Sequence, residues 1–319
     1  MARILREADV DRVIDMDAVI EAVAAAMREL GEGKAQNEPR RRAFATGALL
    51  NVMFATYPGG DCMGLKAYSV ASGKARFLVN VFGLDGSLKA LIEADLMGAY
   101  RTGAASAVAA RALAPGGGEP VTVALIGSGH QARTQALALS RVLSIKEMRV
   151  FSRDQAHREK FASAWREAAL GFPVVATASA EAAVRDADVV VTITTSSEPV
   201  LSADWVKSPA LVIGAGSNFP NRSELPPDLI PRAATVVVDQ QAVARLESGD
   251  LITAVNAGKF EWERTVELGS VLTGGWKPPA EPGITLFESH GMALWDLAAA
   301  SVVLPKAIEQ GLGEEIALF

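Results

Sequence analysis

Small residues at three positions could bring the backbone close to the phosphates of a nucleotide. Gly127, Gly129 and Ala132 directly follow the apolar run at 121–126 and open a stretch with helical periodicity. Gly127 would allow a tight turn, and Gly129 would let the backbone approach a pyrophosphate at the helix N-terminus, where free N–H groups favour anions. Alanine is a small replacement that the third glycine position tolerates. The predicted dinucleotide-binding loop comprises Gly127, Gly129, His130, Gln131 and Ala132.

The end of the next predicted strand bears on which nicotinamide cofactor binds. An acid at this place bonds the ribose 2′-hydroxyl of NAD and repels the 2′-phosphate of NADP. Here the strand ends with Ser152 and Arg153, a hydroxyl and a guanidinium that accommodate a phosphate. The pattern therefore favours NADP, while Asp154 keeps NAD open.

The cysteine and the histidines predict no metal chemistry. Cys62 is the single cysteine, which excludes an intrachain disulfide, and His130, His157 and His290 show no ligand spacing. Because no histidine or acid can be assigned to Cys62 as a partner, we interpret it as a small buried apolar residue rather than a nucleophile.

Composition narrows the class of protein further. Of the 319 residues 50% are hydrophobic and 21% are charged, which is enough for a large core and two domains. A net charge of -6 without a basic stripe argues against a nucleic-acid partner. The apolar runs are too short to span a bilayer, and residues 1–30 lack the pattern of a signal peptide. We therefore expect a cytoplasmic protein without membrane contact.

The first third of the chain predicts a mixed α+β arrangement. Apolar residues at helical spacing predict a helix over 17–30, with Asp17 as the N-cap and Gly31 as the stop. Short runs rich in Val, Leu and Phe over 48–94, separated by turn residues, predict antiparallel strands. An alanine-rich helix follows over 95–113, and the Pro-Gly run at 115–118 marks a domain boundary.

Beyond Pro120 apolar strands alternate with helices. This βαβ alternation predicts a parallel sheet covered on both faces, which is a Rossmann-type domain. The predicted fold class is α/β, with a Rossmann-type dinucleotide-binding domain and a second α+β domain.

Several segments resemble a known family. LIGSGHQARTQALAL looks like the dinucleotide loop of the ornithine cyclodeaminase and mu-crystallin family. EPRRRAF, GLKAYSV, YRTGAASAVAARALA, GAGSNFPNRSEL, ESGDL and GITLFESHGMALWDLAAA are similar to family blocks in the same order, so the resemblance covers nearly the whole chain.

The resemblance implies a two-lobed homodimer. A substrate and dimerisation domain would be formed by 1–115 and the C-terminal segment 296–319, and an NAD(P)-binding Rossmann domain by 119–295. It also implies a site in the cleft between the lobes, where the nicotinamide faces a small imino or amino acid substrate.

Three cations match the family residues around the substrate carboxylate: Arg40, Lys66 and Arg101. An arginine presents a planar fork to a carboxylate, and a lysine supplies a point charge or a proton. Arg41 or Arg42 could take the place of Arg40 in a slightly shifted register.

Other residues match positions close to the cofactor. Thr102 matches a phosphate contact, Arg101 lies beside it in the same block, and Ser289 with His290 matches the stretch against the nicotinamide. His290 could donate a proton to a reduced imine, although a lone histidine is more often structural. Turn or capping roles are the alternative for the threonines. The remaining cofactor candidates are Thr194, Thr195, Gly216 and Ser217.

Two departures from the cyclodeaminase pattern argue for a different reaction. Members that cyclise ornithine carry an acid in a block that resembles GDxPxxxEL, and this chain has Asn218 there. Asn51 stands where the cyclodeaminase block has a glutamate. An amide accepts no proton near neutral pH, so Asn218 cannot be a general base.

Reduction of a formed imine needs a bound carboxylate, a hydride donor and a proton. We therefore predict an NAD(P)H-dependent reductase of 2-imino acids, cyclic such as Δ1-pyrroline-2-carboxylate or acyclic such as iminosuccinate, in which Asn218 hydrogen-bonds the nitrogen or a water. The alternatives are an ornithine or lysine cyclodeaminase with another base, an alanine-type dehydrogenase, and a non-enzymatic ligand-binding protein like some mu-crystallins. The sequence does not identify the substrate side chain.

Overall fold

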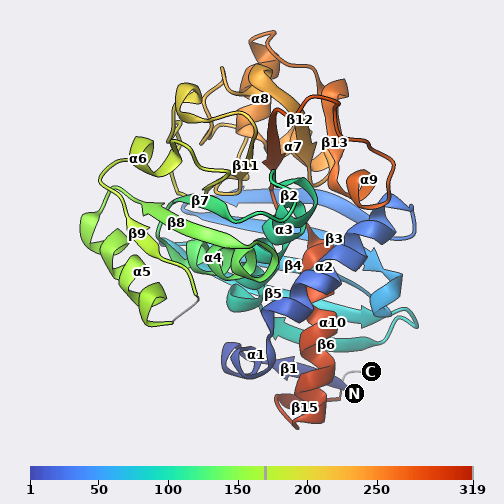
Figure 1. The fold of residues 1–319 in the computed structure, drawn as a ribbon. Helices are drawn as coiled ribbons and strands as arrows, with labels where there is room; N and C mark the ends of the chain where they lie inside the picture. Colours follow the sequence, from blue (N-terminus) through green and yellow to red (C-terminus); the bar gives the residue numbers. More distant parts are fainter. Residues whose placement is uncertain (169–170, 318–319) are drawn as a thin grey trace. The chain divides into compact units, whose positions relative to one another are not determined.

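The protein forms two compact units in a computed structural model that describes residues 1–168 and 171–317 (Figure 1). Unit 1 contains Met1–Ala105 and the chain from Gly291 onwards, and unit 2 contains Ser106–His290. The first division falls inside the helix α3 (Asp95–Leu113), upstream of the Pro-Gly run where the sequence suggested a boundary. Residues 318–319, the end of the predicted segment 296–319, lie outside the described residues.

Unit 1 is built on a seven-stranded sheet in the order β15-β1-β6-β5-β4-β3-β2. The antiparallel pairing of β3 to β6 follows the predicted turns, because the Pro58–Gly60 turn joins β3 to β4 and Ser72-Gly73 joins β4 to β5. Gly73 has a φ of 71°, a left-handed value that favours glycine. The strands are β1 (Ala2–Leu5), β2 (Gln36–Ala45), β3 (Ala48–Tyr57), β4 (Cys62–Ala71), β5 (Lys74–Gly83), β6 (Leu88–Glu93) and β15 (Glu314–Ile316).

One face of this sheet is covered by the C-terminal helix α10 (Ala293–Glu309), which packs on β3, β4 and β5 (Figure 1). Buried and exposed residues alternate along β3, as expected for a sheet with one covered face. The helices α1 (Glu7–Val13) and α2 (Met16–Gly31) and the first part of α3 complete unit 1. The Trp295 indole of α10 donates to Met27 Sδ of α2 at 3.0 Å.

The predicted cap of α2 was wrong by two residues. Asp15, rather than Asp17, is the N-cap, because Asp15 has extended backbone angles and its carboxylate accepts a hydrogen bond from Ala18 N at 2.9 Å. Asp17 lies in the first turn of the helix, where a negative charge complements the helix dipole.

Unit 2 contains a parallel sheet of eight strands in the order β13-β12-β14-β11-β10-β7-β8-β9, which confirms the predicted Rossmann-type arrangement. The strands are β7 (Val121–Ile126), β8 (Ile145–Phe151), β9 (Val174–Ala176), β10 (Val189–Thr192), β11 (Ala210–Gly214), β12 (Ala233–Val238), β13 (Thr265–Glu267) and β14 (Ile284–Glu288). The helices are α4 (His130–Val142), α5 (Gln155–Glu167), α6 (Ala180–Val184), α7 (Gln241–Glu247), α8 (Gly249–Asn256) and α9 (Leu268–Leu272).

The strand order reverses beside β7. From β7 the chain builds outward through β8 to β9, and it then returns to place β10 on the other side of β7. In open parallel sheets a ligand binds at such a reversal, outside the carboxyl ends of the strands. Among the described helices, none combines the length and the apolar character needed to cross a bilayer.

Candidate functional site

The loop after β7 has the geometry that a dinucleotide requires. Gly127 has a φ of 124°, and a Cβ atom there would lie 2.3 Å from Ile193 O, so a larger residue does not fit. Gly129 is the N-cap of α4, and no described atom lies within 4 Å of the place where its Cβ would stand. Ala132 is fully buried. The loop thus combines a close turn with an open helix N-terminus that can receive an anion.

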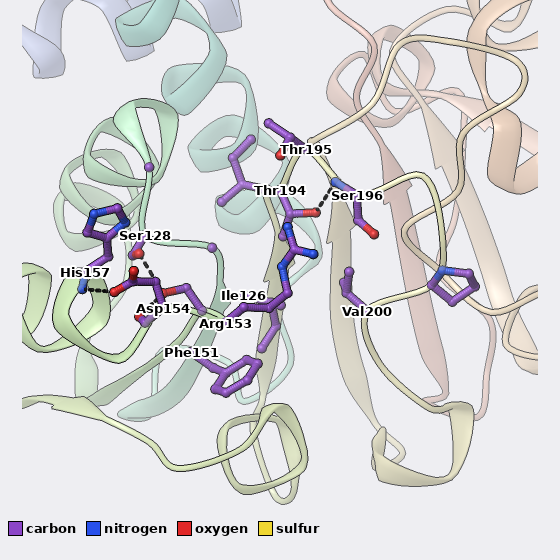
Figure 2. A pocket seen from close by; sticks show the side chains of 15 residues that line it. Ile126, Ser128, Phe151, Arg153, Asp154, His157, Thr194, Thr195, Ser196 and Val200 are labelled. Carbon is purple, nitrogen blue, oxygen red and sulfur yellow. Dashed lines mark hydrogen bonds between the residues drawn. The ribbon is translucent and has the colours of Figure 1, made fainter.

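A cavity of about 480 Å³ opens at this loop (Figure 2). Its volume lies within the range of small-molecule and cofactor sites. The ends of β7, β8 and β10 meet around it, so the segments that follow three separate strands supply its wall. The lining residues are 126–129, 151–154, 193–196, His157, Pro199 and Val200. Of the predicted cofactor residues, the cavity brings together Gly127, Gly129, Ser152, Arg153, Thr194 and Thr195.

The side chains that follow β8 are unequally available to a ligand. The Asp154 carboxylate caps α5 by accepting a hydrogen bond from His157 N at 2.9 Å, which lowers the pKa of Asp154 (Figure 2). Ser152 Oγ accepts from Ser128 Oγ at 2.8 Å. Arg153 is exposed and lines the cavity. The carboxylate is therefore engaged in a helix cap, whereas the guanidinium faces the cavity.

Unit 1 gathers the cations that the sequence assigned to a substrate carboxylate. Lys66 of β4 and Arg101 of α3 both contact one oxygen of Asp296, with Lys66 Nζ at 2.8 Å and Arg101 Nε at 3.2 Å from Oδ1. All three side chains are buried. Asp296 lies in the first turn of α10, where the helix dipole favours its charge. We call these three residues the Lys66–Asp296–Arg101 cluster.

Arg40 joins this cluster, and its neighbour does not. The pairing of β2 with β3 shifts register between Glu38 and Arg41, and Arg40 is buried while Arg41 is exposed. A Cβ on Gly291 would lie 2.8 Å from Arg101 Nη1 and 3.5 Å from Arg40 Nη2. Both guanidinium groups therefore approach the same glycine.

Lys66 has an unusual acidity. Burial lowers its pKa, the Asp296 carboxylate opposes that shift, and the charges of Arg101 and Arg40 lower the pKa as well, so that together they bring it to about 8. Lys66 can therefore release a proton near neutral pH.

His290 lies between two buried acids of unit 2. Its Nδ1 is 3.5 Å from Asp239 and its Nε2 is 3.5 Å from Glu288. Burial alone lowers the pKa, but the hydrogen bonds with Asp239 and Glu288 raise the pKa of His290 to about 10. The ring is therefore a cation at neutral pH, so it can donate a proton but cannot act as a base.

The other predicted residues occupy less distinctive positions. Thr102 Oγ1 donates to Gly98 O at 2.8 Å within α3, and Ser289 N donates to Gly214 O at 2.9 Å. Asn218 and Ser217 are half-buried in the loop after β11. Asn51 is fully buried, and neither of its amide atoms has a hydrogen-bond partner among the described residues. Their roles stay predictions, as do those of His130 and Gln131 in the first turn of α4.

Two acids were missed by the sequence reasoning. Asp296 stands in the apolar stretch ALWDLAAA, and a lone acid among apolar helical residues is a signal that could have drawn attention to it. Glu224 belongs to the block GAGSNFPNRSEL, where roles were assigned to Gly216, Ser217 and Asn218 but not to Glu224. Glu224 accepts hydrogen bonds from Thr194 and from Gly216 N.

The parallel sheet and its glycine loop define a dinucleotide-binding protein of the α/β class. A sequence profile described as "Ornithine cyclodeaminase/mu-crystallin family" matches residues 2–311. The chain belongs to this family, as its sequence blocks predicted.

Relatives of this chain include a reductase and a dehydrogenase. The Δ1-pyrroline-2-carboxylate reductase of Bacillus cereus is 32% identical over 96% of each chain. The same enzyme from Thermococcus litoralis, solved with NADH and L-proline, is 28% identical with a TM-score of 0.92 and covers 98% of this chain and 100% of its own. An archaeal alanine dehydrogenase dimer with bound NAD is 30% identical with a TM-score of 0.92 and covers 100% of this chain and 99% of its own.

Proposed function

We propose that the protein is an NAD(P)H-dependent reductase that converts 2-imino acids, with Δ1-pyrroline-2-carboxylate as the first candidate, into L-amino acids. The observation that carries this proposal is the buried Lys66–Asp296–Arg101 cluster, with Arg40 beside it. The relatives support it, because a reductase of this substrate matches nearly the whole chain and another was solved with NADH and L-proline.

In this proposal the cations of unit 1 bind the substrate carboxylate and supply a proton. Arg40 and Arg101 hold the substrate carboxylate, because guanidinium groups pair with carboxylates through two parallel hydrogen bonds. Lys66 supplies positive charge and a proton for the substrate nitrogen. The cofactor, when bound, supplies the hydride that reduces the C=N carbon. One hydride and one proton added across the C=N bond give the amine.

Cyclodeamination fits this chain less well. That reaction needs a base toward the substrate amine, and the amide of Asn218 accepts no proton near neutral pH. His290 does not replace the missing base, because its hydrogen bonds to two acids raise its pKa to about 10. We propose that Asn218 hydrogen-bonds the imine nitrogen or a water, and that the protonated His290 ring acts as a hydrogen-bond donor.

NADP is the preferred cofactor in this proposal. Arg153 lines the cavity at the end of β8, and Asp154 is occupied by the cap of α5. A 2′-phosphate is therefore met by a guanidinium and is not repelled by an uncommitted carboxylate. Ser152, also in the cavity wall, adds a hydroxyl.

The protein works as a cytoplasmic homodimer in this proposal. On the face of the unit 1 sheet opposite to α10, apolar side chains of β3, β4 and β5 lie in register, with Phe54 opposite Leu65 and Ala67 opposite both Val52 and Leu78. We call this set, together with Leu50, the sheet patch. Phe54 is 49% exposed and Leu78 is 47% exposed in the single chain. Contiguous exposed apolar surface of this kind marks an interface, and one solved relative is a dimer.

An absorbance assay tests the proposed activity. NADPH and NADH oxidation is followed with Δ1-pyrroline-2-carboxylate, Δ1-piperideine-2-carboxylate, and pyruvate, glyoxylate or oxaloacetate with ammonia or methylamine. We expect rapid oxidation with a cyclic imine and loss of it in Lys66→Ala, because the variant lacks the cation and the proton. Lys74→Ala, on the same sheet and exposed, is the matched control and keeps the activity.

The other outcomes separate the alternatives. Oxidation that requires high ammonium with pyruvate indicates an alanine-type dehydrogenase. Silence with every imine, together with proline and ammonia formed from ornithine, overturns the proposal in favour of a cyclodeaminase. A protein that binds NADPH and converts none of these compounds supports a ligand-binding role.

A further inference from the structure

Glu224 is a buried carboxylate of unit 2 that the proposed reaction does not use. Its side chain is 1% exposed. Oε1 accepts hydrogen bonds from Thr194 N at 2.7 Å and from Thr194 Oγ1 at 2.5 Å, and Oε2 accepts from Gly216 N at 2.8 Å. Every one of these partners is a donor, so both oxygens serve as acceptors only. Burial raises the pKa of Glu224, and the hydrogen bonds from Thr194 and Gly216 oppose that shift.

The donors come from the ends of two neighbouring strands. Thr192 at the end of β10 pairs with Gly214 at the end of β11, and Thr194 and Gly216 each follow two residues later. The Glu224 carboxylate therefore bridges the two loops that leave this edge of the sheet. This edge lies beside the strand-order reversal, where a ligand is expected.

The Glu224 carboxylate is connected directly to the cavity wall. Thr194 lines the cavity, and its hydroxyl accepts a hydrogen bond from Ser196 N at 3.0 Å (Figure 2). Val200, another lining residue, donates a hydrogen bond from its backbone N–H to the backbone carbonyl oxygen of Glu224 at 2.8 Å. One residue outside the wall thus holds both ends of the 194–200 segment.

The surroundings of Glu224 leave it little freedom to move. Asp250 Oδ1 accepts hydrogen bonds from the backbone N–H groups of Glu224 at 2.9 Å and of Leu225 at 2.8 Å. A Cβ on Gly216 would lie 2.2 Å from Glu224 Oε2, so only glycine allows this approach. The backbone and the carboxylate of Glu224 are therefore fixed independently.

We infer that Glu224 is a positioning residue that sets the β10 and β11 loops in the geometry required to bind the nicotinamide cofactor. This inference rests on the proposed function, because it assigns the cavity to that cofactor. Glu224 itself contacts neither cofactor nor substrate in this role and acts through Thr194, Gly216 and Val200.

Glu224→Gln tests the inference with almost no change in volume. A glutamine has one acceptor oxygen and one NH2 donor. Whichever way the amide turns, its NH2 faces the backbone N–H of either Thr194 or Gly216, and that donor loses its partner. We expect the Kd for NADPH, measured by fluorescence titration, to rise about tenfold or more. The KM for the imine should change less than the Kd for NADPH, because the cations that bind the imine carboxylate belong to unit 1 and only Asn218 lies in the β11 loop.

The matched control is Glu198→Gln. Glu198 lies in the same 194–200 segment, and its exposed side chain is outside the cavity lining. This variant removes a negative charge from the loop and should keep the parent Kd for NADPH. Circular dichroism and the melting temperature establish that each variant is folded before binding is measured.

The possible results separate this inference from the proposed function. If the parent protein binds neither NADPH nor NADH, the proposed function fails. If the parent binds NADPH and folded Glu224→Gln binds it equally well, only the positioning role is wrong. If Glu224→Gln does not fold, Glu224→Asp decides the matter, because it shortens the side chain by one methylene, so that the carboxylate cannot reach both Thr194 and Gly216, and it changes no residue of the cavity wall. A raised Kd for NADPH in folded Glu224→Asp supports the inference, and an unchanged Kd overturns it.

Discussion

At the scale of single residues, the pKa of Lys66 predicts the pH dependence of the reaction. Burial and two neighbouring arginines lower this pKa to about 8. The protonated form supplies the charge and the proton, so activity should be present below about pH 8 and lost as the pH rises above it. Loss of one required proton gives a fall of about tenfold per pH unit in kcat/KM on the basic side.

The variant Asp296→Asn tests whether Lys66 is the group whose deprotonation lowers kcat/KM. The Asp296 charge and its hydrogen bond raise the pKa of Lys66, so removal of that charge should lower the pKa and move the basic limb to lower pH. Asp85→Asn is the control, because Asp85 forms an exposed ion pair with Lys89 at 3.8 Å. A basic limb that stays in place in Asp296→Asn would show that a group other than Lys66 titrates.

A substitution of Arg153 tests the proposed preference for NADPH over NADH. If its guanidinium receives a 2′-phosphate, Arg153→Ala should raise the KM for NADPH about tenfold or more and leave the KM for NADH nearly unchanged. Lys160→Ala removes an exposed cation from the neighbouring helix α5 and should change neither value. Equal effects of Arg153→Ala on both cofactors would argue against NADP preference.

At the scale of elements, the sequence predicted what local pattern and turn chemistry encode. The glycine turn at 127, the Ser72-Gly73 turn and the βαβ alternation all appear as expected. The strand β2 was not predicted, because Pro39 and three consecutive arginines interrupt the alternation of apolar and polar residues that marks a strand. The pairing of β2 with β3 also shifts register beside these residues. The strand β14 has only five residues, and it lies between β11 and β12, an insertion that chain order does not reveal.

At the scale of the whole molecule, the candidate site depends on contacts between distant parts of the sequence. Lys66 and Asp296 are 230 residues apart and meet because the last long helix returns to the N-terminal sheet. One sequence specifies the periodicity of α10 but does not specify which strand residue its acid will face. The family resemblance identified Lys66 and Arg101 as site residues. It did not identify their shared partner Asp296 or the Glu224 carboxylate.

The sheet patch makes a prediction about assembly. A second copy of the chain would cover the exposed Phe54 and Leu78 side chains, so a charge placed there should separate the subunits by burying an unpaired ion. We expect the parent protein to have the mass of a dimer in light scattering after gel filtration. The single variants Phe54→Glu and Leu78→Lys should each shift toward the mass of a monomer. Ile308→Glu, an exposed apolar position on α10, is the control and should stay dimeric. A parent protein of monomer mass, or dimers that persist in both patch variants, would show that the two subunits do not meet through this face.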